Sequence, residues 1–231
     1  MTDFAGESIP GGWSQRAVTI NGLSFRLTLP ADPEQVLDQT AADNREDRDP
    51  YWAELWPAAL STAKFVLEHA WTPEAHCLEI GCGIGLLGMA AQAAGLKVTI
   101  TDKDPRAVRL AVHNAQENGL AKPDSQVLDW HSTIAESYAV VLASDVLYER
   151  TEHLPLLDFL RRTLTATGVC WIGDPGRSHA SEFVHNANQT GWQVTLFDEH
   201  GGQRDSVTIG QFVLLRMVSP LRNEIINGAM N

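Results

Sequence analysis

From residue 77 to residue 215, short apolar runs alternate with segments whose apolar positions recur about every three to four residues. The short runs predict β-strands, and the amphipathic segments predict helices. Strands are expected at Cys77–Ile80, Lys97–Thr101, Gln126–Leu128, Tyr138–Ala143, Gly168–Ile172, Trp192–Phe197 and Ser206–Leu215. Helices are expected between most of these strands, at Leu86–Ala94, Pro105–Asn118, Glu152–Leu164 and Ser181–Thr190. This alternation predicts a parallel sheet with helices on both faces.

The last two strands have no helix between them, so they are expected to pair antiparallel at one edge. The predicted fold class is therefore α/β, a Rossmann-like, seven-strand, doubly wound sheet with an antiparallel C-terminal strand. Ligands of such sheets bind beyond the carboxyl ends of the strands, near the point where the strand order reverses.

The first fifty residues are interpreted as an extension. Asn21–Gly22 between two apolar runs predicts a β-hairpin, because both central positions of such a turn need a positive φ. Asp32–Pro33 is expected to open a short helix, and Asp43–Asp49 to form a charged linker. A helix over Tyr51–Ala70 follows. We expect three parts: an N-terminal extension (1–50), a main domain (51–217) and a C-terminal tail (218–231).

Charge and composition narrow the range of functions. Seventeen Lys and Arg against 29 Asp and Glu give a net charge of −12, which argues against a general nucleic-acid binder. The three cysteines and eight histidines lack metal-ligand spacing, so no metal is expected. Met1–Pro10 does not resemble a signal peptide, and the long uncharged run Ile80–Leu96 is shorter than the ~20 residues of a membrane span. We expect a cytoplasmic protein without membrane or nucleic-acid partners.

The segment Glu79–Gly85 (EIGCGIG) follows a strand and opens a helix. Its glycines permit a tight turn and let a ligand lie against bare backbone, while the helix N-terminus supplies free N–H groups. Asp102, 21 residues after Gly81, stands where an acid accepts hydrogen bonds from a ribose diol. The spacing Gly83-x-Gly85-x-x-Gly88 also fits the dinucleotide fingerprint, but its glycines come too late and extend into the expected helix, and Glu79 has no role in that motif.

Together with Asp129–Trp130 and Ser144–Tyr148 (SDVLY), this loop resembles the class I, seven-strand S-adenosylmethionine-dependent methyltransferases. The D-x-x-Y motif after the fourth strand is similar to that of the protein-lysine methyltransferase group, and Pro50–Pro57 looks like that group's first segment. Gly173–Arg177 (GDPGR) is similar to the branch that includes the electron-transfer flavoprotein β-subunit enzyme. In that branch Gly-Gly-Gln would follow Trp56–Pro57, and here Ala58–Leu60 (AAL) stands instead.

The resemblance implies a role for each candidate residue. S-adenosylmethionine is the implied cofactor, with Gly81, Gly83 and Gly85 against its methionyl part, Asp102 at the ribose, and Asp129 and Trp130 at the adenine. The implied pocket also includes Trp56, Glu79 and Ser144. Asp145 and Tyr148 are the implied catalytic pair, and a single helical turn would put both on one side. They would orient a neutral amine and help its proton leave to water. Asp174 and Arg177 would grip the substrate or brace the site.

Several functions remain open on these residues. The leading hypothesis is N-methylation of a lysine on a protein substrate. A small molecule, or a protein histidine or arginine, is the alternative acceptor. Base and amide methylation is disfavoured, because its usual Asn-Pro-Pro or Asp-Pro-Pro motif is absent after the fourth strand. An NAD-dependent oxidoreductase and a cofactor-binding protein without transfer activity are the more distant alternatives. The sequence leaves open the target, the number of methyl groups and the oligomeric state.

Overall fold

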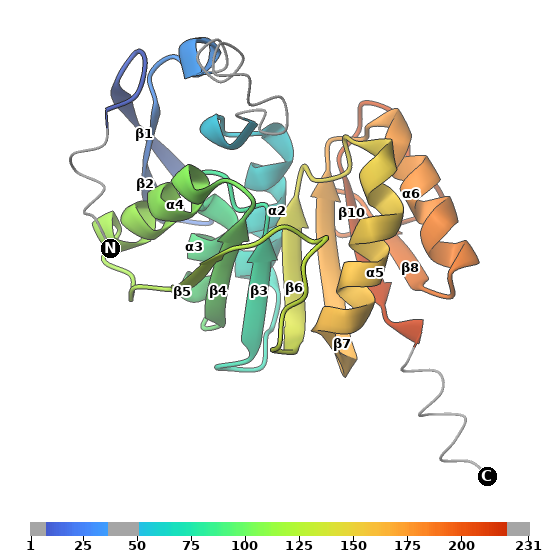
Figure 1. The fold of residues 1–231 in the computed structure, drawn as a ribbon. Helices are drawn as coiled ribbons and strands as arrows, with labels where there is room; N and C mark the ends of the chain where they lie inside the picture. Colours follow the sequence, from blue (N-terminus) through green and yellow to red (C-terminus); the bar gives the residue numbers. More distant parts are fainter. Residues whose placement is uncertain (1–7, 37–50, 221–231) are drawn as a thin grey trace.

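The computed structural model describes residues 8–36 and 51–220 and is built on one twisted sheet (Figure 1). Its strand order is β5-β4-β3-β6-β7-β10-β8-β9. The strands are β3 (His76–Ile80), β4 (Lys97–Asp102), β5 (Asp124–Val127), β6 (Tyr138–Ser144), β7 (Leu164–Asp174), β8 (Gln193–Phe197), β9 (Gln203–Arg204) and β10 (Val213–Val218). The pairs from β5 to β7 are parallel, and β10 lies antiparallel between β7 and β8. This arrangement confirms the predicted fold class; the two-residue β9 adds a short edge strand.

The last strand begins at Val213, whereas the apolar pattern predicted a start at Ser206. The residues before it form a loop that packs on the turn after β7. The N–H of Gly210 donates to the carbonyl of Gly176 at 2.9 Å, and a Cβ on Gly176 would lie 2.3 Å from the carbonyl oxygen of Gln211. The backbone of this loop therefore packs against the turn at Gly176 and does not extend the strand ladder.

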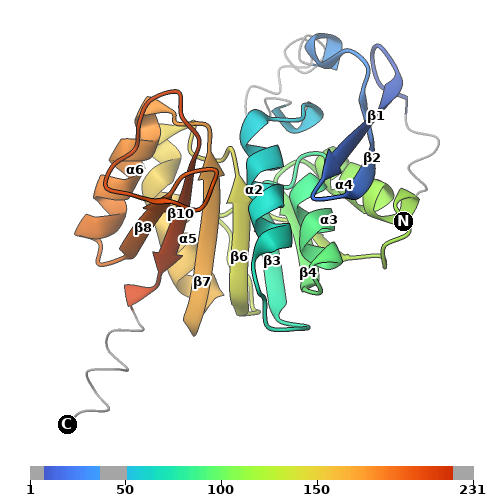
Figure 2. The ribbon, with the colours of Figure 1, turned by 180° about the vertical axis from the view of Figure 1, so that it is seen from behind.

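Helices cover the two faces of the sheet, as Figures 1 and 2 show from opposite sides. One face packs against α2 (Pro57–Glu68), α3 (Leu86–Ala93) and α4 (Pro105–Glu117). The other face packs against α5 (His153–Thr163) and α6 (Ser178–Gln189). The central strands β3 and β6 contribute buried side chains to both cores, which explains why they read as continuous apolar runs.

The helix expected over Tyr51–Ala70 is shorter in the structure. Tyr51–Ala53 forms a 3-10 turn, and α2 begins only at Pro57. Trp56 is extended, with φ −71° and ψ 147°, the conformation that the residue before a proline prefers. Because Pro57 can start a helix but not continue one, the chain turns here and delivers Tyr51, Trp52 and Trp56 to one side of the sheet.

The N-terminal hairpin forms as predicted. β1 (Trp13–Ile20) pairs antiparallel with β2 (Leu23–Pro30) through Asn21 and Gly22, whose φ angles are +50° and +80°. Its buried side chains belong to the same hydrophobic core as α3 and α4. Residues 33–36 are helical, and Asp32 accepts a hydrogen bond from the N–H of Gln35. The predicted linker 43–49 and the tail beyond residue 220 lie outside the described residues.

Within residues 8–36 and 51–220, every helix falls short of the length and apolar character needed to cross a bilayer. The same residues hold no His, Cys, Asp and Glu grouping suited to a metal ion. Cys77, Cys82 and Cys170 are free and buried.

Candidate functional site

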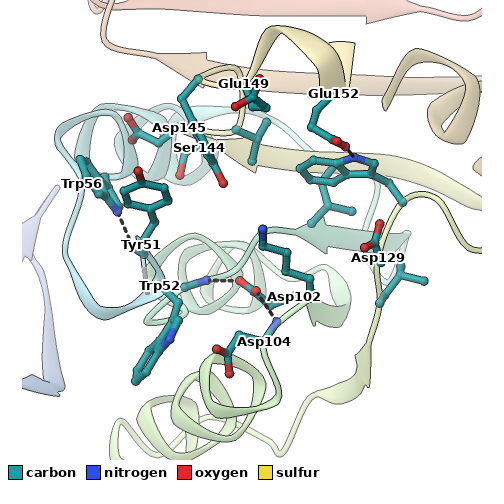
Figure 3. Close-up of a pocket in the computed structure, with 18 of the residues that line it drawn as sticks. Tyr51, Trp52, Trp56, Asp102, Asp104, Asp129, Ser144, Asp145, Glu149 and Glu152 are labelled. Atoms are coloured by element: carbon teal, nitrogen blue, oxygen red, sulfur yellow. Dashed lines mark hydrogen bonds between the residues drawn. The ribbon is translucent and has the colours of Figure 1, made fainter. Parts of the chain in front are cut away.

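A cavity of about 640 Å³ opens at the carboxyl ends of the parallel strands, beside the neighbouring strands β3 and β6 where the strand order reverses. Its volume lies within the usual ~300–1,000 Å³ range of ligand pockets. Figure 3 shows the carboxylates of Asp102, Asp129, Asp145 and Glu152 distributed around it. The remaining lining comes mainly from the glycine loop, the segment 128–131, the segment after β6 and the aromatic residues before α2.

Gly81 and Gly83 form the wall where the glycine loop was predicted to meet a ligand. Both have positive φ angles, +64° and +51°. A Cβ on Gly81 would come within 3.0 Å of the Val146 side chain. The two glycines thus leave bare backbone at the pocket surface.

Gly85 was predicted to contact the cofactor, but the structure places it between two helices instead. It precedes α3 with φ +85°, and a Cβ there would lie 2.6 Å from the Cβ of Ala111 on α4. Its small size allows α3 and α4 to pack closely.

Glu79 was also predicted to belong to the pocket, and the structure places its side chain behind the glycine loop. The side chain is buried, with its carboxylate against the first turn of α3. Burial raises its pKa to about 8, despite a hydrogen bond from the Gly88 N–H. The Glu79 side chain therefore packs behind the glycine loop, against α3, and does not face the pocket.

Asp102 ends β4 and lies at the floor of the pocket (Figure 3). One carboxylate oxygen accepts from the Gly83 N–H at 3.0 Å, and the other accepts from the Asp104 N–H at 2.9 Å. Burial raises its pKa to about 6. Each oxygen keeps a further lone pair for a ligand hydroxyl. Asp104 caps α4 by accepting from the Arg106 N–H at 2.7 Å.

Asp129 and Trp130 line the far side of the pocket, next to His131. The indole N–H of Trp130 donates to the carboxylate of Glu152, which also contacts the His131 ring at 2.8 Å. Glu152 comes from the turn before α5, a position that sequence spacing could not connect with Trp130. Its carboxylate fixes the plane of the indole, and an indole face can cover a flat ring.

Three aromatic residues before α2 close another side of the cavity: Tyr51, Trp52 and Trp56. The Trp56 indole N–H donates to the Tyr51 carbonyl at 2.6 Å, and the Tyr51 ring packs edge-on against Tyr148 at 5.2 Å. Trp56 was predicted here, whereas Tyr51 and Trp52 were not. Trp52 is also buried in the hydrophobic core, so it belongs both to the core and to the pocket wall.

Asp145 lies immediately after β6 with φ +60°. Its carboxylate contacts the Arg177 guanidinium at 2.9 Å and lies close to the Ala58 N–H at the start of α2, which lowers its pKa. Burial raises its pKa, and Arg177 counteracts part of this rise. Both Asp145 and the preceding Ser144 line the pocket. The carboxylate is thus paired with a cation and lies beside the N-terminus of α2, which suits an orienting group better than a proton acceptor.

Arg177 lines the pocket, but Asp174, its predicted companion, does not. Asp174 is fully buried; it accepts from the N–H groups of Gly176 and Arg177 and pairs with the Arg177 guanidinium at 3.0 Å. Asp174 therefore holds Arg177 in place, and Arg177 in turn pairs with Asp145.

The segment from Asp145 to Tyr148 is not helical, contrary to the expected single turn. Two histidines hold its backbone from behind: His153 contacts the Leu147 carbonyl at 3.2 Å, and His179 the Tyr148 carbonyl at 3.0 Å. Asp145 and Tyr148 still line the same pocket. His153 begins α5 and His179 lies in α6. Sequence spacing offered no signal for these contacts.

The described residues fit an S-adenosylmethionine molecule. Bare glycine backbone, a buried carboxylate with spare acceptor positions and a fixed indole lie along one cavity, in the order that a methionyl group, a ribose and an adenine require. Apart from the two-residue β9, the sheet has the seven strands, mostly parallel, of the class I S-adenosylmethionine-dependent methyltransferases, and it carries this loop and this acid at the place where such sheets bind ligands.

Comparison with known proteins identifies the family. Residues 42–190 match the lysine methyltransferase family, and the chain belongs to it. S-adenosylmethionine is accordingly its cofactor. The chain is 30% identical over 136 residues to the electron transfer flavoprotein beta subunit lysine methyltransferase of Xenopus laevis, covering 58% of this chain and 55% of that protein. It is also 30% identical over 148 residues to the release factor glutamine methyltransferase of Escherichia coli, covering 62% and 53%.

Among solved structures, the glycopeptide N-methyltransferase MtfA in complex with S-adenosylmethionine has the same fold. Its TM-score is 0.55 at 15% sequence identity, over 75% of this chain and 99% of that one. The chain spans about half the length of the curated relatives it matches.

Proposed function

We propose that this protein transfers a methyl group from S-adenosylmethionine to the side-chain nitrogen of a lysine in another protein. The observation that carries the proposal is the common cavity of the glycine loop and the segment 144–148. The first would hold the cofactor, and the second would receive the amine at the methyl group. The family and the flavoprotein relative add support for lysine as the acceptor.

The cofactor supplies an electrophilic methyl group on a positively charged sulfur. Transfer needs a neutral amine whose lone pair is aligned with the breaking bond, although lysine is normally protonated near pH 7. In the proposed mechanism the Asp145 carboxylate, fixed by Arg177, and the Tyr148 hydroxyl orient the amine. Its proton leaves to water beside them.

Two conservative variants test this assignment: Asp145→Asn and Tyr148→Phe. Asparagine tolerates the left-handed backbone of residue 145, and phenylalanine keeps the ring against Tyr51. We expect both variants to bind S-adenosylhomocysteine as the wild type does and to lose at least about tenfold in methyl transfer, because misplacing a reacting group by about 1 Å can cost about 10²-fold. Full activity in both variants would refute the catalytic assignment.

The acceptor is tested by labelling. A lysate of the source organism lacking this gene is incubated with the protein and tritiated S-adenosylmethionine. One labelled protein band, absent with Asp145→Asn and assigned to lysine by mass spectrometry, is the expected result. Label in a small molecule, or on a histidine, arginine or glutamine, would overturn lysine as the acceptor.

We also propose a cytoplasmic location and a protein partner without nucleic acid or membrane. Three buried free thiols suit a reducing compartment, and the charge of −12 disfavours polyanions. Cell fractionation with an antibody tests the location.

Residues 51–217 are proposed as the catalytic part and 1–50 as an extension that supports it.

A further inference from the structure

The outer edge of β2 is covered by two asparagine side chains, Asn114 of α4 and Asn118, the residue that follows the end of α4. The amide of Asn118 accepts from the Arg26 N–H at 2.8 Å and donates to the Arg26 carbonyl at 2.7 Å. The amide of Asn114 does the same at Thr28, with distances of 2.8 and 3.0 Å. Each side chain thus replaces one peptide group of a missing neighbouring strand, and the unpaired edge of the hairpin is satisfied.

The two asparagines differ in their remaining donor. The second N–H of Asn114 donates to the carbonyl of Ile84 at 2.8 Å, between Gly83 and Gly85 in the glycine loop. The side-chain NH₂ group of Asn118 makes its other contacts with the Asn114 carbonyl and the Met89 sulfur, at 2.7 and 3.5 Å. Asn114 alone of this pair joins the hairpin to the loop.

A displacement of Asn114 would move the glycine loop. Asn114 is fully buried, so the hydrogen bonds of its amide have no water to replace them. The Ile84 carbonyl is part of the peptide bond between Ile84 and Gly85. The preceding peptide bond joins Ile84 to Gly83. Gly83 lines the pocket and donates its N–H to Asp102. A shift at Ile84 therefore changes the backbone that the cofactor meets.

We propose that Asn114 is a positioning residue that couples docking of the N-terminal hairpin to the shape of the cofactor loop. Residues 8–36 then strengthen cofactor binding, although none of them lines the pocket. The coupling is reciprocal: if docking of the hairpin strengthens cofactor binding, then cofactor binding must stabilise the docked hairpin by the same free energy. This inference requires cofactor binding and not lysine methylation, so the two proposals can fail separately.

A matched pair of variants in the full chain tests the coupling: Asn114→Asp and Asn118→Asp. Each keeps the side-chain size and the acceptor for a hairpin N–H, and each replaces the NH₂ donor. Only the first change reaches the glycine loop. Affinity for S-adenosylhomocysteine is measured by isothermal titration, and urea unfolding reports how much stability each variant loses.

We expect Asn114→Asp to weaken S-adenosylhomocysteine about tenfold more than Asn118→Asp does, a difference equivalent to about 1.4 kcal/mol. This difference should persist when the two variants have similar unfolding midpoints, which a purely structural role would not produce. Equal affinities for the two variants would overturn the proposal.

A second measurement uses the wild type and remains decisive if a variant does not fold. Hydrogen exchange of the Arg26 and Thr28 amides is followed with and without S-adenosylhomocysteine. We expect the ligand to slow both at least about threefold, with no change at Phe183 in α6, on the other face of the sheet. Unchanged exchange at Arg26 and Thr28 in the liganded protein would contradict the coupling.

Discussion

Asp102 combines a buried carboxylate with two backbone N–H donors, and this combination has a consequence for cofactor binding. Its pKa is about 6 because burial outweighs the stabilisation by Gly83 and Asp104. A ribose hydroxyl donates best to the ionised form. We therefore expect affinity for S-adenosylhomocysteine to fall as the pH drops below 6, by up to about tenfold per pH unit.

Isothermal titration between pH 5 and pH 7.5 checks this expectation. Asp102→Asn is the control, since it should bind more weakly at pH 7.5 and show much less pH dependence. A wild-type affinity that is constant from pH 5 to pH 7.5 would exclude Asp102 as the ribose acceptor.

Glu79 gives a prediction for stability. Its pKa in the folded protein is about 8, above the ordinary value of 4.5, chiefly through burial. The unfolded chain loses this proton more readily, so the contribution of Glu79 to stability is greatest below pH 4.5 and is lost as the pH rises toward 8. Since one pKa unit corresponds to about 1.36 kcal/mol, we expect Glu79→Gln to be more stable than the wild type at pH 8 by more than about 1 kcal/mol.

Urea unfolding at pH 5 and pH 8 measures this difference. The advantage of Glu79→Gln should shrink at pH 5, where the wild-type side chain is mostly neutral. An advantage that does not depend on pH would mean that Glu79 is not protonated in the folded protein.

Individual site residues were predictable where a residue type and its place at a strand end carry the chemistry. Gly81, Gly83, Asp102, Asp129, Trp130 and Asp145 line the pocket as expected. Glu79 and Gly85 match motif positions equally well, but the Glu79 side chain and the missing Cβ of Gly85 serve packing. Asp174 does not line the pocket and takes the bracing role, one of its two predicted roles, through its contacts with Arg177. A motif gives the position of a residue and not the direction in which it points. Glu152, His153 and His179 act through contacts between distant segments, which spacing cannot reveal.

The elements show a related limit. Alternating patterns were sufficient to predict the sheet and the antiparallel strand. They misplaced the start of β10, because Val207, Ile209 and Phe212 resemble a strand although the chain there packs around Gly176. The start of α2 was misplaced for a similar reason. The residues before Pro57 are largely apolar, but a proline keeps the residue before it out of the helical conformation.

The contact between α3 and α4 gives a prediction at the element scale. Gly85 and Gly95 have almost the same φ, +85° and +87°, but a Cβ on Gly85 would meet Ala111 whereas one on Gly95 would meet nothing within 4 Å. Alanine costs about 1–2 kcal/mol at either position through backbone strain. We expect Gly85→Ala to cost about 1–3 kcal/mol more, because the two helices must separate.

Urea unfolding of the two variants, compared at one pH, separates the two contributions. Gly85→Ala should also bind S-adenosylhomocysteine more weakly, whereas Gly95→Ala should bind as the wild type does. Equal stability losses would mean that α4 adjusts freely to a larger neighbour.

For the molecule as a whole, charge is expected to influence the encounter with a substrate. The chain carries −12, and the pocket is lined by six carboxylates: Asp102, Asp104, Asp129, Asp145, Glu149 and Glu152. A lysine-containing partner would be attracted over distances comparable to the Debye length, about 10 Å at 0.1 M salt. We expect the KM for the protein substrate to rise severalfold between about 0.05 and 0.5 M NaCl, while the KM for S-adenosylmethionine changes little.

Steady-state kinetics in NaCl and in an equal osmolarity of sucrose measures this effect. The sucrose series controls for solute effects other than screening. If the KM of the protein substrate is insensitive to salt, recognition depends on contacts at short range and not on the field of the molecule.

The left-handed backbone of Asp145 restricts how this site can change over generations. With φ at +60°, the position accepts asparagine and glycine readily and other side chains poorly. The amino acids that preserve the turn are therefore few, and two of the three have no charge. One nucleotide change, from an aspartate to an asparagine or a glycine codon, would keep this turn and remove the carboxylate that we propose to orient the amine. If that proposal holds, descendants that bind the cofactor without transferring its methyl group are one mutation away, and residue 145 is the position at which to recognise them.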